Sequence, residues 1–259
     1  MIHVHEITQH YGVRPVLRNV SFDVETGQLV TVLGPNGMGK TTLLAVLAGV
    51  LWPQKGHVEI GGRRRRASEE DELAIRRQVA YLPDNPWLPL TNTGREFVIS
   101  VGRLYEIDDD RLFDHCDRLL ALFDLAKEGD WPISDYSRGQ RQKIALCSAL
   151  ITEAPYLLLD EPFAGGLDPS GILALKQVLL RLAARSDVTV VMTTPVTELV
   201  EELADKIAIV QDGQLVAYDT ADGLRRQAKC SGTLAEAIER ITHPQTLENI
   251  DRYFQEPLP

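Results

Sequence analysis

The stretch Gly34-Pro-Asn-Gly-Met-Gly-Lys40-Thr41-Thr42, directly after the apolar run Leu29 to Leu33, decides the fold of this chain. The apolar run has the length of a buried strand, and the residues from Thr41 onward begin a helical pattern. The spacing matches G-x-x-x-x-G-K-[ST], in which glycines let backbone N–H groups curl around phosphate oxygens. The stretch therefore predicts a strand, a phosphate-binding loop and a helix, with a nucleoside triphosphate as the ligand.

Each part of this loop has an expected role. Lys40 would reach the β- and γ-phosphates, Thr41 would place its hydroxyl on Mg²⁺, and the positive end of the helix would point at the same anion. Taken alone, the string would also fit a chance glycine-rich turn before an ordinary helix. The residues expected to contact ATP here are Gly34, Pro35, Asn36, Gly37, Met38, Gly39, Lys40, Thr41 and Thr42.

A second candidate site is the acidic pair Asp160-Glu161, which follows the short apolar run Tyr156 to Leu159. Asp160 at a strand end can hold Mg²⁺ through water, and Glu161 can polarise the water that attacks the γ-phosphate. We therefore expect Asp160 to bind metal and Glu161 to be the catalytic base. A strand running into a solvated acidic turn would have the same sequence, but the phosphate loop upstream favours catalysis.

Between these two sites, the segment Asp135 to Lys143 precedes a helical pattern at Ile144 to Ile151. It resembles the L-S-G-G-Q signature of ATP-binding cassette (ABC) ATPases, with Tyr136 in place of the leucine and Arg138 in place of the first glycine. In that family the signature lies at a helix N-terminus and binds the γ-phosphate of ATP held by the other subunit. The resemblance implies nucleotide binding in trans by Ser137, Gly139 and Gln140.

The resemblance covers roughly residues 2 to 220. Tyr11 matches the family's aromatic residue that stacks on adenine, although a ring near the N-terminus is otherwise most often a core residue. Gly166-Leu-Asp168-Pro169 matches the loop that crosses the dimer interface. The strings at residues 81–86 and 93–97 and the helical tail resemble the branch that serves drug, polymer or ion export permeases.

Two positions depart from the family pattern. Where the family usually has a glutamine, this chain has Asp84, whose carboxylate can still ligate Mg²⁺ but adds negative charge beside the acidic pair. Where the family has a histidine on the γ-phosphate, this chain has Pro195, which has no donor. Losing one donor typically costs about 3 kcal/mol, or about a hundredfold in rate. Slow hydrolysis is expected unless Thr193 or Thr194 supplies a hydroxyl, or a different ATPase subunit completes one site.

The composition excludes some function classes. The net charge of −10 argues against nonspecific nucleic-acid binding, because such binding needs Lys and Arg to neutralise phosphates. The one basic run, Arg63 to Arg66, is expected to be a solvated turn in preference to a lipid or nucleic-acid patch. The longest apolar stretch, Leu43 to Trp52, is too short to span a bilayer, and the N-terminus lacks the features of a signal peptide. We expect reduced thiols at Cys116, Cys147 and Cys230, because these cysteines show no C-x-x-C or Cys/His spacing of a metal site.

The periodicity predicts an α/β fold with a P-loop NTPase core containing a parallel sheet, an antiparallel β layer and an inserted helical subdomain. The expected domains are an ABC ATPase domain at 1–220, with its core in 1–89 and 152–220 and its helical subdomain at about 90–151, and a helical tail at 221–259. Expected helices are 96–105, 111–125, 170–184, 196–204 and 232–242, and expected strands include 156–159, 188–192, 206–210 and 214–217.

The resemblance implies an ATP-binding and ATP-hydrolysing subunit that powers a separately encoded membrane permease, with export favoured. It implies a homodimer or a heterodimer with another ABC ATPase, and a cytoplasmic location at the inner face of the membrane through the permease. The net charge predicts no nucleic-acid partner. The permease would dock around residues 84 to 105, where Trp87 and Leu88 lie. One alternative is a weakly hydrolysing regulatory switch, which Pro195 favours and Glu161 disfavours. Another is a soluble, non-transport ABC ATPase.

Overall fold

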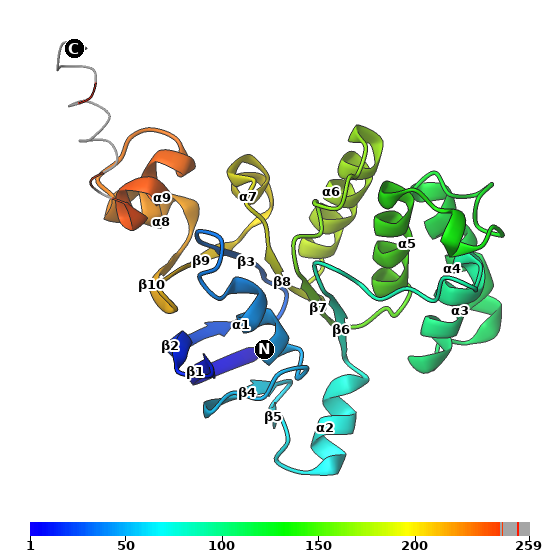
Figure 1. The fold of residues 1–259 in the computed structure, drawn as a ribbon, viewed down its shortest axis with the longest axis horizontal. Helices are drawn as coiled ribbons and strands as arrows, with labels where there is room; N and C mark the ends of the chain where they lie inside the picture. Colours follow the sequence, from blue (N-terminus) through cyan, green and yellow to red (C-terminus); the bar gives the residue numbers. More distant parts are fainter. Residues whose placement is uncertain (244, 246–252, 254–259) are drawn as a thin grey trace.

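The computed structural model describes residues 1–243, 245 and 253, and contains two sheets and a group of helices (Figure 1). The strand order is β10-β9-β3-β8-β7-β6 in the larger sheet and β2-β1-β4-β5 in the smaller one. The larger sheet consists of β3 (Leu29–Leu33), β6 (Val79–Leu82), β7 (Tyr156–Leu159), β8 (Thr189–Thr193), β9 (Lys206–Gln211) and β10 (Gln214–Asp219). The smaller sheet consists of β1 (Ile2–Tyr11), β2 (Arg14–Val24), β4 (Lys55–Ile60) and β5 (Arg63–Arg64).

The larger sheet is parallel except at β10, which pairs antiparallel with β9. Every residue of β3, β7 and β8 is buried, as expected for central strands of a sheet that is covered on both faces. These three strands are neighbours, so the loops after their carboxyl ends meet at one edge of the sheet. That edge carries the phosphate loop and the acidic pair.

Helix α1 (Lys40–Leu47) packs between the two sheets. Its apolar residues Leu43, Leu44 and Leu47 share one core with residues of the antiparallel strands and of β3, β8 and β9. Since α1 follows the phosphate loop directly, burial of its apolar residues fixes the loop on the sheet. This single core joins the predicted antiparallel β layer to the parallel sheet.

The helices on the right of Figure 1 form a second layer, and their buried side chains share one core with residues of β6, β7 and β8. This group contains α3 (Gly94–Leu104), α4 (Asp109–Leu122), the short 3₁₀ helix η1 (Ile133–Asp135) and α5 (Arg138–Leu150). The remaining helices are α2 (Glu69–Arg76), α6 (Pro169–Ala183), α7 (Thr197–Leu203), α8 (Ala221–Gln227) and α9 (Leu234–Thr242). Among the helices of the described residues, none is long and apolar enough to cross a bilayer.

The predicted fold class is confirmed, and the expected helices and strands match observed ones within a few residues. The expected helix 232–242 is α9, and most of the tail beyond it lies outside the described residues. The sequence interpretation did not identify α2 and α8 as helices. The division into a core, a helical subdomain and a tail stays a prediction.

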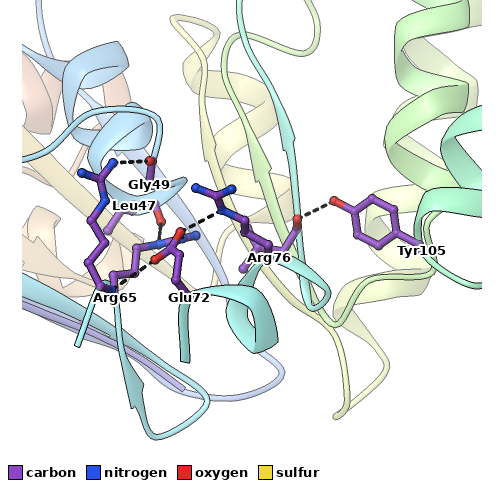
Figure 2. A network of polar contacts seen from close by, with 8 residues as sticks. Leu47, Gly49, Arg65, Glu72, Arg76 and Tyr105 are labelled. Atoms are coloured by element: carbon purple, nitrogen blue, oxygen red, sulfur yellow. Dashed lines mark hydrogen bonds and ion pairs between the residues drawn. The ribbon is translucent and has the colours of Figure 1, made fainter. Parts of the chain in front are cut away.

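The expected solvated turn at the four arginines is wrong for one of them (Figure 2). The Arg65 side chain is only 6% exposed, donating from Nε to the carbonyl of Leu47 at 2.7 Å and from Nη1 to Glu72 at 3.0 Å. Arg66 donates to the carbonyl of Gly49 at 3.2 Å. Two arginines thus bind one carbonyl of the last residue of α1 and one just beyond the helix, where positive charge is favourable. The run is structural, because it ties α1 to α2.

Candidate nucleotide-binding site

The phosphate loop requires glycine for two separate reasons. Gly34, Gly37 and Gly39 all have positive φ, at 150°, 79° and 99°. A Cβ on Gly34 would lie 2.0 Å from the carbonyl oxygen of Val210, and one on Gly39 would lie 2.7 Å from that of Val16. The loop is therefore pressed between β9 and β2, and side chains at these two positions would displace it.

Lys40 lies inside this loop. The side chain is buried, and its Nζ donates to the carbonyl oxygens of Gly34 at 2.8 Å and Pro35 at 3.1 Å. Burial lowers the pKa of Lys40, while the carboxylates of Glu161 and Asp160 act in the opposite direction. The structure thus brings the loop and the acidic pair together, as the sequence predicted. A phosphate would offer charged acceptors, which bind a lysine more strongly than carbonyls do.

The two members of the acidic pair have different surroundings. Asp160 is fully buried; its Oδ1 accepts a hydrogen bond from the hydroxyl of Thr193 at 2.6 Å, and its Oδ2 has no hydrogen-bond partner. Glu161 is partly buried and adopts a left-handed backbone with φ of 46°. Burial, and then the charge of Asp84, raises the pKa of Glu161.

These groups fit a Mg²⁺ ion held largely by other ligands. Mg²⁺ prefers oxygen ligands. Asp160 offers a buried carboxylate oxygen that has no hydrogen-bond partner, and exposed Thr41 offers its hydroxyl oxygen. Across the described part of the chain, no cluster of three His, Cys, Asp or Glu side chains is arranged to hold a metal by itself. Mg²⁺ normally keeps several waters and uses substrate phosphates, so one or two protein ligands suffice.

Asp84 follows β6, the neighbour of β7, and is exposed. Its charge acts on Glu161, as described above. Burial, with smaller contributions from the charges of Asp160 and Asp84, raises the pKa of Tyr81 to about 12. The sequence analysis expected this carboxylate beside the acidic pair, and the electrostatic coupling agrees with that position.

The loop after β8 contains Pro195, the position at which the family has a histidine. Pro195 is exposed, and Thr194 is buried with its hydroxyl accepting from the N–H of Val196 at 3.3 Å. The hydroxyl of Thr193 already donates its single proton to Asp160. Thr193 is therefore a poor substitute for the histidine. Of the alternatives predicted from the sequence, the hydroxyl of Thr194 and a different ATPase subunit remain.

The signature segment caps helix α5. Ser137 accepts from the N–H of Gln140 at 3.2 Å, and the Gln140 side chain accepts from the N–H of Ser137 at 2.9 Å, which forms a capping box. A Cβ on Gly139 would lie 2.6 Å from the carbonyl oxygen of Gly166, so the predicted interface loop packs against the signature. Figure 1 shows α5 well apart from α1, so the chain does not bring its own signature to its own phosphate loop.

The sequence analysis missed Lys143. This lysine of α5 is buried and donates to Asp168 at 3.1 Å, and Asp168 also caps α6 by accepting from the N–H of Gly171 at 2.8 Å. The pair fixes the signature helix to the predicted interface loop. The available signal was a lysine beside the apolar residues that α5 buries.

Tyr11 ends β1, and the residue is 56% exposed. The hairpin that carries it continues into β2, whose Val16 carbonyl packs against Gly39 of the phosphate loop. The aromatic ring therefore belongs to a hairpin that borders the loop, and it is free to stack on a flat ligand.

The family follows from a comparison with known proteins. Residues 17–164 match the model of the family described as ABC transporter. The chain belongs to this family. It is 35% identical over 219 residues to the daunorubicin resistance ATP-binding protein DrrA3 of Streptomyces coeruleorubidus, which covers 85% of this chain and 68% of that protein. It is 31% identical over 227 residues to the ABC-type transporter ATP-binding protein EcsA of Bacillus subtilis, covering 88% and 90%.

Solved ABC cassettes share the fold. An ATP-binding subunit of an ABC transporter superposes with a TM-score of 0.86 at 28% identity, covering 93% of this chain and 99% of that one. A dimeric cassette bound to ADP and Pi superposes with a TM-score of 0.77 at 23% identity, covering 85% and 98%. This chain is an ATP-binding subunit of an ABC transporter. Its family is one of ATPases, whose members bind ATP with Mg²⁺.

Proposed function

We propose that this ABC subunit is the ATP-hydrolysing motor of an exporter, that it works as a dimer of cassettes, and that it drives a separately encoded membrane permease. The observation that carries the proposal is the meeting of Lys40, Asp160 and Glu161 at one edge of the parallel sheet. Phosphoryl transfer to water needs three such groups. They are a cation that binds phosphate, a carboxylate with a free buried oxygen for the metal, and a second carboxylate of raised pKa.

In this proposal each group has one task. Lys40 and the backbone of the phosphate loop hold the β- and γ-phosphates, and Thr41, Asp84 and Asp160 hold the metal. When bound, Mg²⁺ would neutralise charge on the β- and γ-phosphates. Glu161 accepts the proton of the attacking water, and its raised pKa makes it a stronger base. Nucleotide binding is assigned to Tyr11, Gly34, Pro35, Asn36, Gly37, Met38, Gly39, Lys40, Thr41 and Thr42, and in trans to Ser137, Gly139 and Gln140.

The dimer is supported by the separation of signature and phosphate loop. Because α5 lies apart from α1 in the chain, a second cassette placed head to tail would bring its signature to this loop. A second copy or a paralogue would serve equally, and a paralogue with a histidine would complete one site. Export is supported by the similarity to DrrA3, a daunorubicin resistance protein. The chain is also 30% identical over 220 residues to a cobalt import ATP-binding protein of Salmonella typhimurium.

Permease docking is assigned to residues 84–105, at the cytoplasmic face of the membrane. A groove of about 710 Å³ lies there, lined by Asp84, Trp87, Leu88 and Arg141 among others. Trp87 is 81% exposed as a residue, so its ring offers a large apolar contact. Trp87→Ala should leave ATP binding intact and uncouple transport when the permease is present. Trp52→Ala, which removes an equally large exposed ring beside α1, should transport normally; normal transport by Trp87→Ala would contradict the docking site.

The motor is tested by Mg²⁺-dependent ATP turnover of the purified chain, with ATP-driven dimerisation followed in the same samples. Lys40→Ala should lose binding and turnover, whereas Glu161→Gln should bind ATP, accumulate as a dimer and stop turning over. Equal turnover in the wild type and Glu161→Gln would refute the proposed base.

A regulatory nucleotide switch is the second candidate, and Pro195 is the observation that favours it. The switch would bind ATP and dimerise with intact Glu161 yet show turnover near zero, alone and with its permease. The similarity to transporter ATP-binding proteins gives no support to a soluble, non-transport ABC ATPase.

A further inference from the structure

We propose that Thr193 is a positioning residue for ATP hydrolysis, whose single hydroxyl sets both members of the acidic pair. The inference rests on the proposed function, because it concerns the same carboxylates. Thr193 would orient Asp160 toward the metal and hold the backbone of Glu161, without touching the nucleotide itself.

The geometry comes from the neighbouring strands β7 and β8. Leu159 pairs with Met192, so the next residues, Asp160 and Thr193, emerge side by side at the end of the two strands. The Thr193 hydroxyl is completely buried; it donates to Oδ1 of Asp160 at 2.6 Å and accepts from the N–H of Glu161 at 2.8 Å. One oxygen atom therefore links a strand end to both carboxylate residues.

The first consequence concerns the orientation of Asp160. The hydrogen bond from Thr193 fixes which carboxylate oxygen faces β8, and the other oxygen, Oδ2, is left buried without a protein partner. That oxygen is the one available to a metal ion or to a water bound to it. Without the hydroxyl, neither oxygen would be distinguished, and the carboxylate would rotate.

The second consequence concerns the backbone of Glu161. This residue has a φ of 46°, a left-handed conformation that is strained for a side chain with a Cβ. Its N–H group finds its acceptor in Thr193, so the hydrogen bond supports the strained turn. The turn in turn keeps the Glu161 carboxylate near Lys40, whose pKa responds to it. Relaxing the turn would move the base away from the phosphate loop.

Three variants separate positioning from simple packing. Thr193→Val has nearly the same shape and lacks the hydroxyl, and Thr193→Ser keeps the hydroxyl. The matched control is Thr189→Val, since Thr189 is also fully buried on β8 and its hydroxyl accepts from the N–H of Gly27 at 3.1 Å, at the strand's opposite end. Thermal unfolding of all three shows whether each variant folds.

The measurements are steady-state kcat and KM for MgATP, nucleotide affinity in EDTA, and Mn²⁺ affinity by electron paramagnetic resonance with a non-hydrolysable ATP analogue. We expect Thr193→Val to lose about a hundredfold in kcat with little change in KM or in metal-free nucleotide affinity, because small misplacement has effects of that size. Mn²⁺ binding should weaken in parallel. Thr193→Ser should recover most of both, and Thr189→Val should resemble the wild type.

The inference is overturned if Thr193→Val keeps kcat and Mn²⁺ affinity within threefold of Thr189→Val, or if serine fails to restore them in a folded protein. A wild type that binds MgATP but turns it over too slowly to measure would weaken the motor proposal, and the Mn²⁺ affinities would then decide on Thr193 alone. A wild type that binds no MgATP would refute both proposals.

Discussion

Replacing Pro195 by histidine should speed ATP turnover. Strand β8 lies between β3, which leads into the phosphate loop, and β7, which leads into the acidic pair. The loop after β8 therefore emerges between the two groups that hold and attack the γ-phosphate. Pro195 is exposed there and offers neither an N–H nor a side-chain donor. The Thr193 hydroxyl two residues earlier is committed to Asp160 and Glu161, so it does not fill the gap.

The expected gain in turnover follows from how much one hydrogen-bond donor lowers the activation barrier. A preorganised donor aimed at developing charge contributes about 3 kcal/mol to the barrier, which is about a hundredfold in rate. The same substitution should lower stability, because a proline stiffens the unfolded chain and its removal costs about 0.4–1 kcal/mol. For a chain of this size that is a fall of a few degrees in Tm, roughly 1–4 °C. Turnover and stability should thus change in opposite directions.

The assay is steady-state Mg²⁺-dependent turnover at saturating ATP, with nucleotide affinity measured separately. Pro195→Ala removes the ring and restores the backbone N–H, as Pro195→His does, but adds no side-chain donor, and it should leave turnover close to that of the wild type. Combining Pro195→His with Glu161→Gln should abolish the gain, because the base is still required. An equal gain in Pro195→Ala, or no gain in a Pro195→His protein that binds ATP normally, would refute the reasoning.

Three further predictions follow from the electrostatics. Glu72→Ala should lower the free energy of unfolding, measured in urea, by about 3 kcal/mol, because it leaves buried Arg65 without its carboxylate. Arg76→Ala should lower it by less than about 1 kcal/mol, since the Arg76 side chain is 64% exposed. Equal losses in the two variants would contradict this prediction. Burial lowers the pKa of His115 below 6.5, so the unfolded chain binds that proton first and stability falls as the pH drops from about 7 to about 5. His115→Gln should show a shallower fall in melting temperature over this range, and an unchanged slope would count against it. Full burial raises the pKa of the Cys147 thiol, so a thiol reagent followed by mass spectrometry should label it no faster than the protein unfolds.

The phosphate loop and the acidic pair could be predicted because their chemistry is local. A loop that holds phosphate through backbone N–H groups needs glycines at fixed spacing, and that spacing is written in consecutive residues. Helix α2 is the opposite case, since most of its residues are charged and it buries only Ile75. The available signal was Ser68, which caps the helix, followed by four acidic residues in its first turn.

The burial of Arg65 could not be predicted without α2, because the carboxylate that neutralises it lies seven residues away on that helix. The same limit applies to Thr193. Its sequence position suggested a spare hydroxyl near the γ-phosphate, but a hydroxyl has one proton, and only the pairing of β7 with β8 shows that Asp160 takes it. A sequence identifies which groups approach a site, whereas the register of the strands decides which of them bind one another.

The two departures from the family pattern lie on opposite sides of the same carboxylates. The strand order β3-β8-β7-β6 places the loop of Pro195 on one side of the acidic pair and the loop of Asp84 on the other. One departure removes a donor and the other adds a negative charge, so both leave the charge of a transferring phosphate less well compensated. Because both act on one charge from the loops on either side of it, their effects on turnover should not add. Restoring glutamine at Asp84 should matter less once Pro195→His has supplied the missing donor.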